Sequence, residues 1–159
     1  MARHAALALL ALLFGALARA DDPDARQLDQ FFARSTLQIA TPDARLHTFD
    51  IWIADDDARR ARGLMFIRQL ADDEGMLFIY PRAQPIGMWM KNTFIPLDML
   101  FVRADGRVER VAENTTPQSL ETIESGKPVL AVVELKAGTA ARLKISSGAQ
   151  VLHAAFKRK

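Results

Sequence analysis

One short stretch of the sequence, residues 89–101, sets a few polar side chains that could do chemistry inside an apolar run. It contains Asp98 in an expected strand, between two apolar neighbours. A carboxylate in such a place must be hydrogen-bonded, paired or at the rim of a sheet. Glu134 poses the same problem in another apolar segment, and Lys91 and Asn92 offer donors that could satisfy either group.

Two interpretations of these polar groups stay open. They could form a concave site in which Trp89 is a flat stacking surface, Lys91 binds an anionic group and other side chains supply directional hydrogen bonds. They could instead form a buried network that fixes the register of the strands. The first interpretation predicts six ligand-binding residues, which are Trp89, Lys91, Asn92, Thr93, Asp98 and Glu134.

The two carboxylates also raise the alternative of a hydrolase-like enzyme. Asp98 and Glu134 could act as acid and base, although the sequence does not give the distance between them. A further hypothesis is a protein-interaction module, in which the polar loop 113–127 contacts a partner and the 89–101 stretch is architectural. Of these functions, binding is favoured over catalysis.

Sulfur offers a different kind of chemistry. Met88 and Met90 flank Trp89, and soft thioethers suit copper(I) in an oxidising compartment. Methionine is also a good core filler, and alternate residues of one strand share a face by default. We therefore expect no metal site and keep Met88 and Met90 only as candidate copper(I) ligands.

Other motifs for cofactors or catalysis do not occur in the sequence. It has no cysteine, no glycine-rich phosphate loop, no dinucleotide fingerprint and no serine nucleophile elbow. His47 and His153 stand alone in strand-like segments, where a structural role is the usual one. No cofactor is expected, and without cysteine there is neither a disulfide framework nor a lipidated cysteine.

The first twenty residues are typical of a secretory signal peptide. A basic start precedes the apolar run 5–17, which is too short to cross a membrane, and Ala18-Arg19-Ala20 offers small residues at a cleavage site. We expect cleavage after Ala20 and a periplasmic or secreted protein without a stable membrane anchor. An uncleaved anchor is the alternative.

The charge of the exported chain restricts its partners. The full sequence has 21 basic and 19 acidic residues, and cleavage removes Arg3 and Arg19 but no acidic residue, so the two kinds balance. Without a basic excess, nucleic acid is not an expected partner. A small polar ligand and another envelope protein remain as partner classes.

Apolar and β-branched runs separated by turn residues indicate a mainly β fold. Short helices are expected at 55–63 and 138–143, and the pattern over 24–34 is weakly helical. We predict a compact single-domain β-sandwich or barrel-like fold of about seven or eight strands with two short helices. The expected strands are 35–40, 45–54, 76–80, 87–90, 97–103, 107–111, 128–135 and 149–156, with Asp105-Gly106 as a hairpin turn.

These elements divide the chain into four segments. Residues 1–20 are the signal peptide, 21–44 a lead-in with the first strand, 45–156 the β domain and 157–159 a basic tail. Removal of 20 residues from 159 leaves 139, which is enough for one compact core.

Six motifs occur in order: RGLM at 62–65, DEGMLF at 73–78, WMKNT at 89–93, IPLDMLF at 95–101, DG at 105–106 and ELKAG at 134–138. Together they resemble domain-of-unknown-function family 192 over residues 46–153. The resemblance implies a small, mainly β, often exported domain without an established reaction, and it carries over Trp89, Lys91, Asn92 and Asp98 as site residues. The chain departs from the family pattern at Met88, which weakens a family-wide copper site, and at Leu130-Ala131, where an aromatic residue is common.

The sequence therefore predicts a periplasmic binding or accessory module. Its ligand would be small and polar or anionic, for example an envelope saccharide, and would be held by the stretch from Trp89 to Asp98.

Overall fold

The structure is a computed structural model that describes residues 22–156. The expected signal peptide and basic tail lie outside this part of the chain. No helix within residues 22–156 is long and apolar enough to cross a membrane. The elements in order are α2 (Pro23–Asp29), β1 (Ala33–Ala40), β2 (Leu46–Ala54), α3 (Asp57–Arg62), β3 (Glu74–Gln84), β4 (Gly87–Met88), β5 (Leu97–Val102), β6 (Val108–Ala112), β7 (Ile123–Glu124), β8 (Val129–Lys136), α4 (Thr139–Leu143), β9 (Gln150–Leu152) and a 3-10 turn (Ala154–Phe156).

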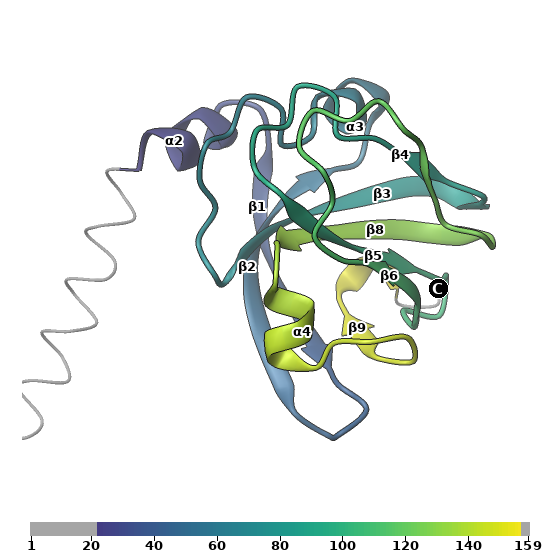
Figure 1. Ribbon diagram of the computed structural model, residues 1–159. Coiled ribbons are helices and arrows are strands. Elements are labelled where there is room, and N and C mark those ends of the chain that lie inside the picture. The colour runs from purple at the N-terminus through teal and green to yellow at the C-terminus, as the bar shows by residue number, and fades with distance from the viewer. Residues whose placement is uncertain (1–21, 157–159) are drawn as a thin grey trace, which may run out of the picture.

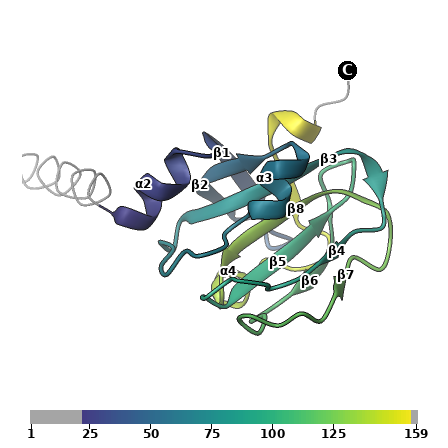
Figure 2. The same cartoon turned by 90° about the horizontal axis from the view of Figure 1, so that it is seen from above.

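Seven strands form one sheet in the order β6-β5-β8-β3-β2-β1-β9. Neighbouring strands are antiparallel except β2 and β3, which run parallel. A bridge between Arg107 and Gln150, together with a 2.8 Å hydrogen bond from Val108 N to Ala149 O, brings the two edges of the sheet together. The sheet is therefore a nearly closed barrel, which confirms the predicted mainly β, barrel-like fold (Figure 1, Figure 2).

The two faces of this sheet carry two separate cores. In β8, Val132 belongs to the outer core and Val133 and Leu135 to the inner core, because successive side chains of a strand point to opposite faces. The inner core fills the barrel and includes Ala140 of α4. The outer core is covered by α2 and by the chain around α3 and β4, for example by Leu28. The pocket that forms the candidate site lies on this outer side.

α3 follows the predicted helix closely. Asp56 caps its start by accepting a hydrogen bond from Arg59 N at 2.7 Å, and Gly63, with a φ of 47°, ends it. A Cβ on Gly63 would lie 3.0 Å from Phe78 Cζ, so glycine lets the chain pass close to β3. The residues that follow Gly63 then run across the outer core. α2, for which the sequence pattern was weak, is a third short helix, capped by Asp22.

Three predicted strands differ from the observed ones by two or more residues at their C-terminal ends. β3 continues past Pro81 to Gln84, because its register against β8 shifts in this region and an irregularity tolerates proline. The expected strand 87–90 ends at Met88, and the expected strand 149–156 is β9 followed by the 3-10 turn.

The polar loop 113–127 is attached to the outer side of the barrel. Its short strand β7 pairs with β4, so that Gly87 lies opposite Glu124 and Met88 opposite Ile123. This two-stranded sheet fixes the start of the 89–101 stretch beside the outer core.

Candidate functional site

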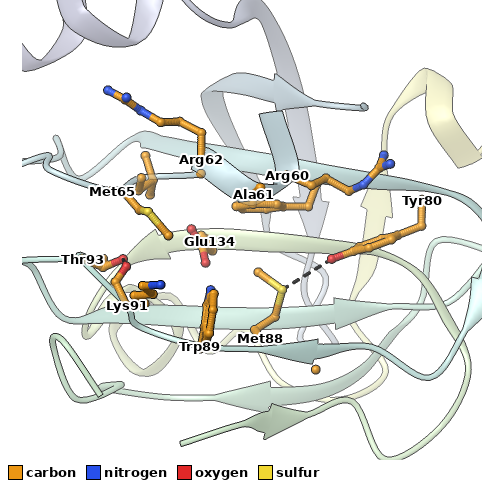
Figure 3. Close-up of a pocket in the computed structure, with 14 residues that line it drawn as sticks. Arg60, Ala61, Arg62, Met65, Tyr80, Met88, Trp89, Lys91, Thr93 and Glu134 are labelled. Atoms are coloured by element: carbon orange, nitrogen blue, oxygen red, sulfur yellow. Dashed lines mark hydrogen bonds between the residues drawn. The ribbon is translucent and has the colours of Figure 1, made fainter. Parts of the chain in front are cut away.

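A pocket of about 100 Å³ opens on the outer side of the barrel, between α3 with the loop after it, β4 and β8. Figure 3 shows the side chains that surround it. It is smaller than the roughly 300–1,000 Å³ typical of sites that enclose a drug-sized ligand. The pocket can therefore enclose only one end of such a molecule. Its lining includes Met65, Tyr80, Met88, Trp89, Lys91 and Glu134.

Glu134 forms the floor of the pocket. It lies on β8 and is only 4% exposed, and its carboxyl group points into the pocket between Met65 and Met88 (Figure 3). No group within residues 22–156 makes a hydrogen bond to this carboxyl. Burial raises the pKa of Glu134 to about 8. At neutral pH it is therefore a protonated acid with a free O–H donor and a free carbonyl acceptor.

The two thioethers beside Glu134 are each oriented by a polar side chain. Tyr80 Oη donates a hydrogen bond to Met88 Sδ at 3.5 Å, as Figure 3 shows. Asn92 Nδ2 donates to Met65 Sδ at 3.8 Å. Sulfur is a weak acceptor, so these contacts orient the side chains more than they stabilise the fold. The walls next to the acid are thus soft and mostly apolar.

Trp89 and Lys91 form the mouth of the pocket. The Trp89 side chain is 49% exposed, and Lys91 Nζ lies 5.0 Å from the centroid of its ring. A cation at this distance from an indole face is attracted by the ring. Lys91 makes no ion pair with any carboxylate of residues 22–156, so its charge is free for a ligand. Thr93 is buried beside them, and its hydroxyl donates to Lys91 O at 3.3 Å.

Arg60 lines the wall of the pocket beside Tyr80, and its guanidinium already has partners within the protein. Its guanidinium donates to Ile79 O at 2.6 Å and to Asp57 Oδ1 at 2.5 Å, and it lies 5.2 Å from the centroid of the Tyr80 ring. Its side chain is 11% exposed. Arg60 therefore fixes the Tyr80 wall and, unlike Lys91, already has partners within the protein.

The comparisons with known proteins identify the family. A family model for DUF192, described as "Uncharacterized ACR", matches residues 38–153. The chain belongs to the DUF192 family. This confirms the resemblance found in the sequence motifs. No match was found among curated proteins.

Two crystal structures are similar to this DUF192 protein. One is a protein from Sinorhizobium meliloti 1021 whose description proposes a transcription regulator. It is 42% identical, the match covers 78% of this chain and 96% of that chain, and the TM-score is 0.76. The other is a protein of unknown function from Novosphingobium aromaticivorans DSM 12444. It is 37% identical, with 76% and 85% of the two chains covered and a TM-score of 0.73.

The fold separates the four DUF192 signature residues that the resemblance carried over. Trp89 and Lys91 line the pocket. Asn92 supports it from outside: its backbone has a φ of 55°, its carbonyl accepts a hydrogen bond from Phe66 N at 2.9 Å, and its amide contacts Met65. Asp98 lies elsewhere.

Asp98 is a structural residue of the barrel interior, contrary to the expectation of a site residue. Its side chain is 0% exposed, and its two oxygens accept hydrogen bonds from Asn114 N at 2.9 Å and from Ala140 N at 2.8 Å. The second bond holds the first turn of α4 against β5. Asp98 and Glu134 therefore do not form the acid–base pair that the hydrolase hypothesis needs.

Met88 and Met90 likewise do not form the copper pair that the sequence suggested. Met90 Sδ accepts a hydrogen bond from Thr115 Oγ1 at 3.1 Å inside the outer core, whereas Met88 lines the pocket. Met65, which sequence reasoning missed, is the sulfur that shares the pocket with Met88. The only sequence feature that marks Met65 is its place in the RGLM motif. That motif does not predict a contact with residues more than twenty positions away.

Metal ligands of other kinds are not grouped. Within residues 22–156, no three His, Asp or Glu side chains lie close enough to hold a metal ion. His153 Nε2 shares a 3.1 Å hydrogen bond with Ser35 Oγ, which fits the structural role expected for a lone histidine.

Proposed function

We propose that this DUF192 domain is a binding module that holds one end of a small polar ligand in the Glu134 pocket. The observation that carries the proposal is the carboxyl group of Glu134, which is 4% exposed and points into the pocket without a partner in the described chain. A ligand hydroxyl or carbonyl that enters the pocket can pair with this carboxyl, and between apolar walls such a hydrogen bond is stronger than in water.

The mouth of the pocket indicates the rest of the ligand. The exposed Trp89 ring offers a flat apolar surface, and Lys91 offers a cation within reach of the same ligand. A sugar ring has an apolar C–H face and hydroxyl groups at its edge, so it fits a Trp surface beside a hydrogen-bonding acid. The cation favours a saccharide with a carboxylate, such as a uronic acid. With the expected export of the chain, the ligand would be an envelope saccharide.

Isothermal titration with galacturonate and with glucose tests the proposal at pH 7. We expect galacturonate to bind more tightly, because only it offers a carboxylate to Lys91. Glu134→Leu should abolish binding and Lys91→Gln should remove the preference, while Glu121→Gln, an exposed control, should change neither. Binding that survives Glu134→Leu would overturn the proposal.

A copper(I) site is a second candidate, because the pocket brings two thioethers together with a carboxyl group. Met65 and Met88 line it on either side of Glu134 (Figure 3), and thioethers are ligands that copper(I) prefers. Titration of the protein with copper(I) against a competing chelator tests this candidate. Met65→Leu and Met88→Leu should each weaken binding, and Met90→Leu should not. Copper(I) held no more tightly than by the chelator would remove the candidate.

Two other functions receive less support. Catalysis by Asp98 and Glu134 is not proposed, because the two carboxyl groups contact different parts of the molecule. Regulation of transcription is named for the Sinorhizobium meliloti relative. The longest helix within residues 22–156 is α2, with seven residues, which is short for a helix that reads DNA bases. DNA-binding folds commonly insert a longer helix into the major groove.

A further inference from the structure

Beside the mouth of the pocket lies a surface on which cations stack on aromatic rings. We call it the Arg–Phe face. Arg62 Cζ lies 4.4 Å from the ring centroid of Phe31 and 5.5 Å from that of Phe66, and Arg68 Cζ lies 5.0 Å from that of Phe94. The rings of Phe66 and Phe94 meet edge to face at 6.0 Å, which joins the two groups into one surface.

The Arg–Phe face is continuous with the pocket. Arg62 belongs to the pocket wall, but its side chain points away from Glu134 toward the outside, as Figure 3 shows. Phe66 follows the pocket residue Met65 directly in the chain. The pocket and the Arg–Phe face are therefore joined through Arg62 and through the step from Met65 to Phe66.

Two of the three aromatic rings of this face are open to solvent. Phe31 is 46% exposed and Phe66 is 44% exposed, although both are large apolar side chains. A cluster of exposed aromatic residues beside a pocket is a mark of a binding surface. Arginine and aromatic side chains are also the residue types that contribute most to binding surfaces.

The backbone holds the Phe66 ring in place at some cost. Its φ is +68°, a conformation that is rare for a bulky side chain. A hydrogen bond from Phe66 N to Asn92 O, at 2.9 Å, ties this strained residue to the loop that carries Lys91. Strain of this kind persists where the surrounding structure enforces it, and it is frequent at ligand-binding sites.

The two arginines of the face differ from neighbouring arginines because they make no ion pair. Neither Arg62 nor Arg68 makes an ion pair with a carboxylate of residues 22–156. Arg59 and Arg60 of α3, the helix that also carries Arg62, are each paired with an aspartate. The neighbouring carboxylate of Asp24 accepts hydrogen bonds from Arg68 N and Gln69 N, both at 2.9 Å. An anionic partner would supply the missing charge.

We propose that the Arg–Phe face binds the continuation of an acidic saccharide chain whose end enters the Glu134 pocket. The inference rests on the proposed function and extends it from a single sugar to an oligomer of uronic acids. Each such unit has an apolar ring face for an aromatic side chain and a carboxylate for an arginine. The small pocket takes one end of the chain, and Arg62 and Arg68 neutralise the carboxylates of the units that follow.

A chain-length series of oligogalacturonates, measured by isothermal titration, tests the inference. We expect the affinity to rise at least about tenfold from the monomer to the hexamer. Once one end of the oligosaccharide is bound, its other units are held close to the face and bind at a high effective concentration. Arg68 lies outside the pocket. Arg68→Gln should therefore lower the affinity of the hexamer about fivefold, as expected for the loss of a partly exposed ion pair, and should leave the affinity of the monomer unchanged. Arg107→Gln, in the turn between β5 and β6, is the matched control and should change neither.

The outcomes separate this inference from the proposed function. Equal affinity for monomer and hexamer would overturn the extended face and leave the pocket proposal standing. A hexamer that binds equally well to Glu134→Leu would show that no chain end enters the pocket and would overturn both. Binding of poly-glutamate or of an oligothymidylate as tight as that of the hexamer would overturn the assignment to a saccharide.

Discussion

Asp98 and Glu134 lie one register position apart on the neighbouring strands β5 and β8, yet their carboxyl groups point to opposite faces of the sheet. Glu134 lies opposite Met99, and Asp98 lies opposite Leu135. Because side chains alternate along a strand, Glu134 faces the outer side with its pocket and Asp98 faces the barrel interior beside α4. The Asp98 carboxyl accepts hydrogen bonds from two backbone N–H groups, whereas the Glu134 carboxyl accepts none within residues 22–156.

The buried acid makes stability depend on pH. The pKa of Glu134 rises from 4.5 to about 8 on folding. Between these values the folded state keeps a proton that the unfolded state has lost, so the free energy of unfolding falls as pH rises, by about 1.4 kcal/mol per pH unit. Glu134→Gln should remove this slope and be more stable than the wild type above pH 8. Urea unfolding at pH 5 to 9 measures both effects.

Glu121→Gln is the control for this slope, because Glu121 is exposed. It should keep the pH dependence of the wild type. If the slope between pH 5 and 8 persists in Glu134→Gln, another group carries it and the protonated state of Glu134 is wrong.

Asp98 should act on stability and not on ligand binding. Asp98→Ala removes the acceptor of two hydrogen bonds, to Asn114 N and Ala140 N, and leaves these donors unpaired in the barrel. Each such loss costs about 1–3 kcal/mol. The midpoint of urea unfolding should fall accordingly, while the folded variant binds galacturonate like the wild type. A large loss of affinity without loss of stability would contradict this role.

The mainly β character of the fold was predictable because turns and strand patterns are local features of the sequence. The hairpin from β1 to β2, the Asp56 cap of α3 and the β5–β6 hairpin around Asp105-Gly106 all follow from residues close together in the chain. The mouth of the pocket was predictable for the same reason, since Trp89 and Lys91 are only two positions apart.

The separation of the two acids was not predictable from the pattern. β5 is buried on both faces, so its sequence lacks the alternation that would show which side chains face inward. The difference between Asp98 and Glu134 depends on the register between β5 and β8, and a shift of one residue would reverse it. Met65 and Tyr80 joined the pocket through tertiary contacts that no local pattern encodes.

The left-handed conformation at Asn92 gives a test of the pocket wall. Its φ of 55° suits glycine and asparagine but costs other residues about 1–2 kcal/mol. Asn92→Gly and Asn92→Ala both remove the amide that contacts Met65, so the difference between them isolates the backbone. The alanine variant should be less stable than the glycine variant by about 1 kcal/mol in urea unfolding. Equal stability would show that the loop relaxes to another conformation.

Export is tested by the N-terminus of the processed protein. Cleavage of the predicted signal peptide after Ala20 would give a chain that starts at Asp21. Intact-mass analysis of the protein from the periplasmic fraction of an expressing bacterium measures this directly. A chain that keeps residues 1–20 in the membrane fraction would favour the uncleaved anchor instead.

The pH dependence of binding distinguishes the saccharide from copper(I). A sugar that accepts a hydrogen bond from Glu134 needs the protonated acid, whose pKa is about 8. Its affinity should be flat below pH 7 and fall about tenfold per pH unit above 8. A metal ion needs the ionised carboxylate and displaces the proton, so copper(I) affinity should rise with pH up to about 8 and then level off. Titration in two buffers of different ionisation enthalpy at pH 8 gives the same distinction, since the sugar should take up protons and the metal should release them. In Glu134→Gln both dependences should vanish, and a dependence that remained would locate the titrating group outside the pocket.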